Sequence, residues 1–431
     1  MQAAVPHNAG AAGAAQPAHG GAMAVITTLF FMMGLITALN DVLIPHLKSV
    51  YALSYVQAML VQFCFFGAYF IVSLPAGMLI KRLGYQNGAV AGFVIAAIGC
   101  ALFYPASHGS YAEFLLAFFV LAAGITIMQV AANPYVTALG DPAKASSRLT
   151  LTQAFNSLGT TIAPTLGGML ILSGAVLSVA DVARLPAVEQ AAYRATEAAT
   201  VQMPYLGLAA LLLVLALVFA FVRMPRISHG DDDAAGDAGG HASAFAHRHL
   251  LLGTIGIFLY VGGEVSIGSF LINFLGERDV AALAPDAAAH YVSYYWGGAM
   301  VGRFIGFVVM RYVSPGKALA TNACAAMLLI LAAIFGRGAL AMWAIIAVGL
   351  CNSIMFPTIF SMSVNKLGKL TGQASGLLCM AIVGGALVPF AQGLLADAVG
   401  LRLSYVVPLG CYVFIMYFGV KYANMYRDER V

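Results

Sequence analysis

Residues 203–222 read MPYLGLAALLLVLALVFAFV, and no charged side chain interrupts the run before Arg223. An α-helix needs about 20 apolar residues to cross the hydrocarbon core of a bilayer, so this stretch predicts a transmembrane helix. The rest of the chain has the same character, because its 431 residues are 61% hydrophobic and only 9% charged. Its mean hydropathy is +0.89. We therefore expect an all-α protein that crosses a membrane many times.

Turn residues and charges divide the chain into twelve apolar runs, in two sets of six. The first six helices are expected near residues 23–49, 54–80, 86–106, 111–139, 147–174 and 203–223. The second six are expected near residues 250–276, 288–312, 316–336, 340–365, 373–398 and 403–424.

The polar stretches around these runs predict the domain organisation, because they contain charges, glycines and no long apolar run. The N-terminal stretch is rich in Ala and Gly and lacks the basic start of a signal peptide. The expected parts are a disordered N-terminal tail (1–22), a six-helix bundle (23–225), a cytoplasmic linker (226–249), a second six-helix bundle (250–424) and a C-terminal tail (425–431).

The two halves match each other at a constant offset of 225 residues. The matching pairs are Gly77 with Gly302, Gly159 with Gly384, Pro164 with Pro389 and Gly168 with Gly393. Four matches at one offset predict parallel six-helix repeats about an axis along the membrane normal. In such an architecture a substrate site is expected between the halves.

The charges indicate orientation and exclude some partners. The net charge of +4 comes from 21 Lys and Arg against 17 Asp and Glu, which are too few and too scattered for a nucleic-acid-binding face. We assign all but six of the Lys and Arg to cytoplasmic loops or helix ends, so both termini are expected in the cytoplasm. The six exceptions are Lys48, Arg184, Arg194, Arg278, Arg337 and Arg402.

Asp41 and Glu264 lie inside apolar runs that carry almost no other charge. A charge at the centre of a bilayer costs about 2.5–3.5 kcal/mol on insertion scales, so it persists mainly beside a water-filled cavity, a partner or a coupled ion. The offset pairs Asp41 with Ser266, two residues from Glu264, which predicts that the two carboxylates flank one central cavity. The alternative for each is a buried structural acid, and Glu264 follows two glycines where a helix can unwind.

Amide side chains gather on three of the expected helices. The fourth helix carries Gln129 and Asn133 with two threonines on one stripe, the fifth carries Gln153 and Asn156, and Asn40 precedes Asp41 on the first. Amides donate and accept hydrogen bonds, which suits the hydroxyls of a neutral sugar or polyol. The alternative is that they join packed helices for about 0.6 kcal/mol each.

Two aromatic residues and several absences complete the sequence-based picture. Tyr295 and Trp296 could stack on a pyranose ring or pack in the protein interior. The six cysteines have no paired spacing, so neither a disulfide framework nor a metal site is predicted. No nucleophile constellation or phosphate-binding loop is present, so we expect neither an enzyme nor a cofactor.

Longer strings carry a family resemblance over nearly the whole chain. They are LNDVLIP (39–45), AANPYVT (131–137), RLTLTQAFNSLGTTIAP (148–164), YVGGEVSIGSFLINF (260–274) and FPTIFSMSVNKLG (356–368). With these strings the chain resembles the fucose:proton symporter family of the major facilitator superfamily, and within it the bacterial glucose/galactose transporters.

The resemblance implies a major facilitator superfamily fold with 12 transmembrane helices in two six-helix bundles. It implies that Asp41 couples protons and that Asn156 lies at a sugar-binding position. The fucose symporters carry a second acid where this chain has Gln129, and an amide where it has Glu264. The second charge is therefore expected to have moved to the seventh helix, which favours the hexose branch over fucose.

The resulting expectation is a secondary transporter that imports a glucose/galactose-type hexose by proton symport, as a monomer in the bacterial inner membrane. Its partners are then the sugar and the lipid bilayer. N-acetylglucosamine, mannose or fucose uptake, sodium coupling and drug export remain open within transport. A non-transporting sugar sensor is the alternative class, although it would need a long folded cytosolic domain that the sequence lacks.

Overall fold

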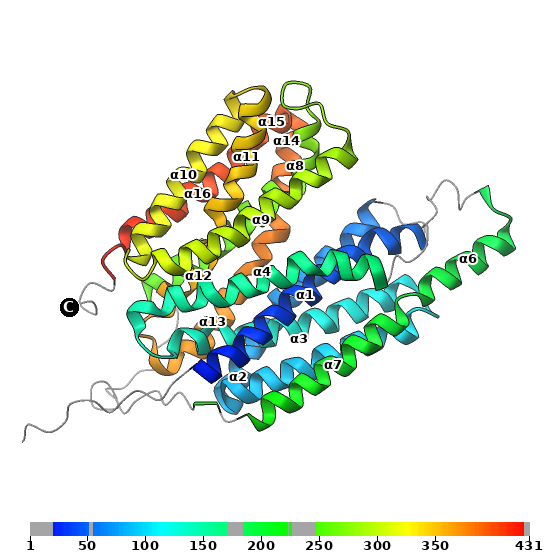
Figure 1. The fold of residues 1–431 in the computed structure, drawn as a ribbon, viewed down its shortest axis with the longest axis horizontal. Coiled ribbons are helices and arrows are strands. Elements are labelled where there is room, and N and C mark those ends of the chain that lie inside the picture. Colours follow the sequence, from blue (N-terminus) through cyan, green and yellow to red (C-terminus); the bar gives the residue numbers. More distant parts are fainter. Residues whose placement is uncertain (1–19, 51–54, 171–183, 223, 226–246, 426–431) are drawn as a thin grey trace, which may run out of the picture.

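A computed structural model describes residues 20–50, 55–170, 184–222, 224–225 and 247–425 (Figure 1). These residues are helical apart from short turns, and no strand occurs among them. The predicted N-terminal tail and linker lie almost wholly outside this description, as does the C-terminal tail beyond Met425. The side chains of Asn40 and Asp41 are also outside it.

The N-terminal half forms one bundle. Its elements are α1 (Gly20–Val50), α2 (Tyr55–Ala106), α3 (Tyr111–Ala138), η1 (Pro142–Lys144), α4 (Ala145–Leu170), α6 (Ala187–Ala199) and α7 (Gln202–Phe221). The 52-residue α2 contains two helices that meet at Gly84, whose φ of 79° and ψ of 167° are not helical. A positive φ is open to glycine because it has no Cβ. The two predicted helices 54–80 and 86–106 therefore lie on either side of Gly84.

The C-terminal half forms the second bundle. Its elements are α8 (Arg248–Gly276), α9 (Pro285–Val309), α10 (Pro315–Phe335), α11 (Gly338–Asn352), α12 (Met355–Ser363), η4 (Gly368–Leu370), α13 (Thr371–Met380), η5 (Ala381–Val383), α14 (Gly384–Val399), α15 (Leu401–Ser404) and α16 (Val406–Lys421). The predicted helices 340–365 and 373–398 are each interrupted, the first between α11 and α12 and the second at η5.

Nine segments of the described residues are long and apolar enough to cross a membrane. One of them, Leu60–Ala106, covers two predicted helices, while α4 and α9 are not among the nine because they carry more polar residues. The count of twelve crossings therefore stays a prediction. The sequence did not predict α6, since its alternating Ala, Glu and Arg residues form no apolar run although alanine favours helix.

The internal repeat appears in the way each half packs. A Cβ on Gly159 of α4 would collide with the Phe31 carbonyl of α1, and a Cβ on Gly384 would collide with the Phe258 carbonyl of α8. Two glycines that match in the sequence thus let the equivalent helix approach the first helix of its own bundle.

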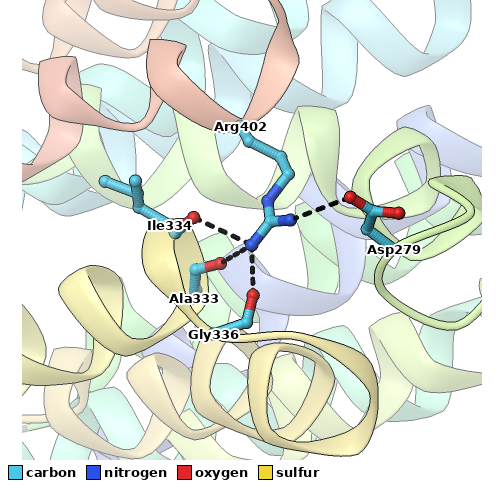
Figure 2. A network of polar contacts seen from close by, with 5 residues as sticks. All are labelled: Asp279, Ala333, Ile334, Gly336 and Arg402. Carbon is cyan, nitrogen blue, oxygen red and sulfur yellow. Dashed lines mark hydrogen bonds and ion pairs between the residues drawn. The ribbon is translucent and has the colours of Figure 1, made fainter.

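Arg402 fastens one end of the C-terminal bundle (Figure 2). Its guanidinium donates hydrogen bonds to the carbonyls of Ala333 at 3.3 Å, Ile334 at 2.8 Å and Gly336, which close α10. Its other terminal nitrogen lies 3.7 Å from the Asp279 carboxylate. A cation at the C-terminus of a helix satisfies carbonyls that have no partner within the helix and balances the negative end of the helix dipole. Arg402 therefore holds three loop regions together.

Candidate functional site

The two bundles touch each other at one end and diverge toward the other (Figure 1). The touching end contains the first turns of α4 and α13 and the last turns of α9 and α12, and we call it the joined end. At the opposite end, α6 of one bundle and α15 of the other are far apart. Two lines of contact connect the bundles at the joined end.

The first line, the polar seam, runs between α4 and the helices α9 and α12. The Ser146 and Ser361 hydroxyls lie 2.6 Å apart, and the Ser147 hydroxyl donates to the Phe307 carbonyl at 2.6 Å. Farther along α4, the Arg303 guanidinium of α9 donates to the Ser157 hydroxyl. Hydrogen bonds made by hydroxyl and guanidinium side chains therefore connect these two surfaces.

The second line, the glycine seam, runs between α13 and the helices α2 and α3. A Cβ on Gly376 would lie 2.6 Å from the Ser73 carbonyl oxygen, and one on Gly77 would lie 2.9 Å from the Gly372 carbonyl oxygen. Across this seam the Ser375 hydroxyl donates a hydrogen bond to the Val130 carbonyl at 2.8 Å. Small residues let the backbones approach closely, as they do in other membrane helix pairs.

The two amides of the predicted fourth helix, which is α3 in the structure, differ in their surroundings. The side-chain Oε1 of Gln129 accepts a hydrogen bond from the buried Tyr69 hydroxyl at 2.8 Å. Asn133 is fully buried, and within the described part of the chain its amide makes no hydrogen bond to an oxygen or nitrogen and has only the Cys379 thiol of α13, a weak partner, beside it. A buried amide without a partner costs about 1–3 kcal/mol, so a ligand or water that reaches it would bind favourably.

The two amides of the predicted fifth helix, which is α4 in the structure, lie one turn apart. Gln153 is buried, whereas Asn156 is half-buried and its Nδ2 donates to the Phe30 carbonyl of α1 at 2.9 Å. This bond uses one of the two N–H groups of the Asn156 amide. The residue therefore joins helices within the N-terminal bundle, which is the structural role that the sequence left as an alternative to sugar binding.

Glu264 lies in the middle of α8 and is 9% exposed. Its Oε1 has no hydrogen-bond partner among the described residues. The Tyr260 hydroxyl lies beside the carboxyl group, and the Arg303 guanidinium acts on it electrostatically. An acid buried with one oxygen unsatisfied is typical of a group that binds a proton or a ligand.

A cluster of hydroxyls and one amide surrounds Glu264. Asn352 donates to the Tyr295 hydroxyl at 2.8 Å and accepts from the Tyr412 hydroxyl at 2.6 Å. The Tyr260 hydroxyl donates to the Asn352 carbonyl, and the Tyr295 hydroxyl donates to the Glu264 carbonyl, both at 3.1 Å. These bonds tie α8, α9, α11 and α16 together around the carboxylate and fix its backbone.

The two aromatic residues predicted to bind substrate differ in exposure. Tyr295 is fully buried and its hydroxyl belongs to the cluster, whereas Trp296 is 39% exposed. The Trp296 indole packs on Gly268, where a Cβ would lie 3.1 Å from the ring. Of the pair, only Trp296 retains a substantially exposed ring surface for a ligand.

The position that matches Asp41 in the second half has its own partners. The Ser266 hydroxyl donates to the side-chain Oε1 of Gln392 at 2.5 Å, and the Gln392 Nε2 donates to the Ser404 hydroxyl at 3.2 Å. Because the Asp41 and Asn40 side chains lie outside the described residues, a common cavity for Asp41 and Glu264 stays a prediction.

Sequence reasoning missed Asn352, Tyr412 and Arg303. The positive-inside assignment placed Arg303 among cytoplasmic residues, but the structure places it within α9, in contact with the other bundle. The signal that could have identified it is a single cation followed by the apolar run FIGFVVM, residues 304–310. No group of three or more His, Cys, Asp or Glu that could hold a metal occurs among the described residues.

Known proteins resemble the chain over nearly its whole length. The sequence profile of the Major Facilitator Superfamily matches residues 26–381. A protein of Brucella abortus named glucose/galactose transporter is 56% identical over 406 residues, covering 94% of this chain and 95% of its own length. The L-fucose-proton symporter of Escherichia coli is 34% identical, with 92% and 91% coverage.

A solved structure agrees with the fold. The crystal structure of the major facilitator superfamily transporter FucP in the outward conformation superposes with a TM-score of 0.85 at 32% identity. The superposition covers 93% of this chain and 98% of FucP.

Proposed function

Because the chain belongs to the Major Facilitator Superfamily, we propose that it imports a neutral hexose of the glucose/galactose type by proton symport. The 56% identity to a glucose/galactose transporter supports the substrate class, and the 34% identity to a fucose-proton symporter supports the coupling ion. The observation that carries the proposal is the match to these transporters along almost the entire chain. It is a transporter and not an enzyme.

Alternating access is the proposed mechanism, with the joined end toward the cytoplasm. The positive-inside rule supports this direction, because Lys81, Arg148, Lys366 and Lys369 lie near the joined end. The described arrangement is then the outward-facing one. Rocking of the bundles would separate the polar and glycine seams and bring the opposite ends together, around a site near the bilayer midplane.

Asp41 and Glu264 are the proposed proton-coupling residues. A neutral, protonated acid can enter a closed dry site more easily than a carboxylate can, and it can donate a hydrogen bond to a sugar hydroxyl. One charge that crosses 100 mV contributes ~2.3 kcal/mol, which supports roughly 50-fold accumulation of sugar. No cofactor is needed for this mechanism.

The proposed sugar ligands are the amides Asn40, Gln129, Asn133, Gln153 and Asn156, with Tyr295 and Trp296 as the aromatic residues. Asn133 supports this assignment through its unsatisfied amide, and Trp296 through its exposed ring. Tyr295 would act indirectly, by holding the Glu264 backbone. We place the protein in the bacterial inner membrane as a monomer, with both termini in the cytoplasm.

Uptake into proteoliposomes tests the proposal. Labelled glucose, galactose, mannose, fucose and N-acetylglucosamine are offered with an inward proton gradient, an inward sodium gradient or none. The expected result is accumulation of glucose and galactose above equilibrium only with the proton gradient. Accumulation of another sugar or dependence on sodium would replace that part of the proposal. Binding without uptake would favour a sensor.

A further inference from the structure

Arg303 stands between the two bundles. It lies in the second half of the 25-residue helix α9, and its side chain is half-buried. Its Nε donates to the Ser353 carbonyl at 3.2 Å, at the break between α11 and α12. Another nitrogen donates to the Ser157 hydroxyl of α4, so one guanidinium connects the C-terminal bundle to the polar seam.

The same guanidinium lies next to the cluster around Glu264, because its acceptor Ser353 directly follows Asn352 in the chain. Asn352 bonds to the Tyr295 hydroxyl, which donates to the Glu264 carbonyl, so the positive charge of Arg303 acts on the Glu264 carboxyl over a short distance. Among the described residues, the other ionisable groups that interact with this carboxyl are Tyr260 on α8, Tyr295 on α9 and Tyr412 on α16. Tyrosine is neutral near pH 7, so Arg303 is the cation of this group. The described contacts contain no direct ion pair between Arg303 and Glu264, because the guanidinium is held on Ser157 and Ser353 instead.

We propose that Arg303 is a positioning residue through which the charge of Glu264 changes the strength of the contact between the bundles. This inference rests on the proposed function, since it gives the proton on Glu264 a structural consequence. A neutral Glu264 leaves the guanidinium on Ser157, which holds the joined end together. An ionised Glu264 attracts the guanidinium and competes with the Ser157 hydroxyl, which weakens the polar seam.

The chemistry of the groups supports this competition. A carboxylate binds a guanidinium more strongly than a neutral hydroxyl does, because both partners are charged and two parallel hydrogen bonds can form. Guanidinium stays protonated at all relevant pH values, so only Glu264 changes its charge. The seam would therefore be strong when Glu264 carries a proton and weak when it does not.

For transport, this competition links the protonation of Glu264 to which end of the protein is open. Protonation at the open side would keep the joined end shut until the sugar has bound. Once that end has opened, release of the proton on the other side would keep it open. By linkage, a ligand that changes the bundle equilibrium must also change the proton affinity of Glu264 by the same factor.

The test measures the bundle arrangement without sugar. Nitroxide labels are attached at Met203→Cys on α7 and Leu340→Cys on α11, two exposed positions at the diverging end, after replacement of the six native cysteines. Electron-spin distance measurements in lipid nanodiscs give the ratio of the separated to the approached population. Between acid and alkaline pH this ratio is expected to fall about fivefold or more, the lower range of usual coupling between sites.

Arg303→Gln and Glu264→Gln are each expected to remove this pH dependence, and the double variant should resemble either single one. Arg311→Gln is the matched control. Arg311 lies two residues after the end of α9, its guanidinium stacks 4.3 Å from the centre of the Phe307 ring, and the described contacts do not join it to Glu264. This control should keep the full pH effect. A merely structural Arg303 would change the ratio equally at every pH.

Two outcomes would overturn the inference: a pH effect that survives Arg303→Gln, or one that survives Glu264→Gln. If Arg303→Gln does not fold, Ser157→Ala serves instead, since it removes the acceptor on α4, and a normal pH effect in that variant is equally contradictory. The readout needs no sugar. A protein that transports another substrate could therefore still support the role of Arg303, while loss of the pH effect would leave the sugar proposal intact.

Discussion

The polar seam and the glycine seam connect the same two bundles by different physical means. In the polar seam, hydroxyls and one guanidinium form hydrogen bonds that water can replace when the bundles separate. In the glycine seam, backbones touch through Gly77, Gly372 and Gly376, so shape decides the fit. The comparison indicates that the first contact responds to charge and the second sets the closest approach.

The buried polar groups strengthen this distinction. The Ser73 hydroxyl beside the glycine seam has no partner in the described structure, whereas Ser146 and Ser147 in the polar seam are both bonded. Each unsatisfied buried group costs about 1–3 kcal/mol, and each hydrogen bond contributes about 0.5–1.5 kcal/mol. The Ser73 hydroxyl therefore opposes the joined arrangement, whereas the Ser146 and Ser147 hydroxyls favour it.

The largest effect is expected in the glycine seam, from Gly376→Ala. The added Cβ would lie 2.6 Å from a backbone oxygen, so the joined end cannot close fully. Uptake should fall about fivefold to 150-fold, since such a clash costs about 1–3 kcal/mol. The control on the same helix is Gly372→Ala, whose Cβ would meet the Gly77 oxygen at an ordinary 3.6 Å. Equal uptake by the two variants in proteoliposomes would contradict the steric role of this seam.

Asn156→Ala tests sugar binding without removing a contact between the two bundles. Asn156 precedes Ser157 of the polar seam but bonds to α1 in its own bundle. Loss of one hydrogen bond to a sugar should weaken affinity several-fold to about tenfold. Calorimetry with glucose and galactose measures this change, and Thr152→Ala, whose hydroxyl bonds to its own helix, is the control. Unchanged affinity in a folded Asn156→Ala protein would leave Asn156 as a helix-joining residue only.

Ser73→Ala should favour the joined arrangement, because it removes a buried hydroxyl that has no partner in the described structure. A gain of about 1 kcal/mol shifts the bundle equilibrium about fivefold, and thermal unfolding should occur at a higher temperature. Ser375→Ala is the opposite case, since that hydroxyl donates to the Val130 carbonyl across the seam. Spin-label distances report both variants. A shift in the same direction for both would refute the distinction between satisfied and unsatisfied hydroxyls.

The smallest effect is expected from Ser146→Ala in the polar seam. The Ser361 hydroxyl keeps its bond to the Thr358 carbonyl at 3.1 Å, so no buried group is left without a partner. Hydrogen bonds between membrane helices average about 0.6 kcal/mol, so the bundle equilibrium should change about threefold. Uptake rates and spin-label populations measure this change, and a loss as large as that of Gly376→Ala would mean that the seams do not differ.

Much of the fold could be predicted from the sequence, since long apolar runs separated by charges have few alternatives in a membrane protein. The two halves were predictable from four residue pairs at one offset, and at the pair Gly159–Gly384 the structure shows the same close helix approach in both bundles. The interruption of the predicted helix 340–365 could not be predicted, because Asn352 and Ser353 lie in an apolar run that does not indicate where the helix ends.

The candidate site was only partly predictable. The buried position of Glu264 followed from the cost of a charge in a bilayer, and the structure places it inside α8 as expected. Its partners did not follow, because Tyr260, Tyr295 and Tyr412 come from three helices and tyrosine is common in apolar runs. Arg303 was missed because it lies only eight residues before Arg311, close enough to be counted as a helix end.

The central claim is that sugar and protons cross together, and proton movement tests it most directly. Glucose or galactose is added to lightly buffered proteoliposomes without any imposed gradient, and the external pH is recorded. The account predicts sugar-dependent alkalinisation of the medium, absent in Asp41→Asn liposomes that still exchange labelled sugar. Uptake of labelled hexose by the unaltered protein with no change of external pH would contradict proton symport.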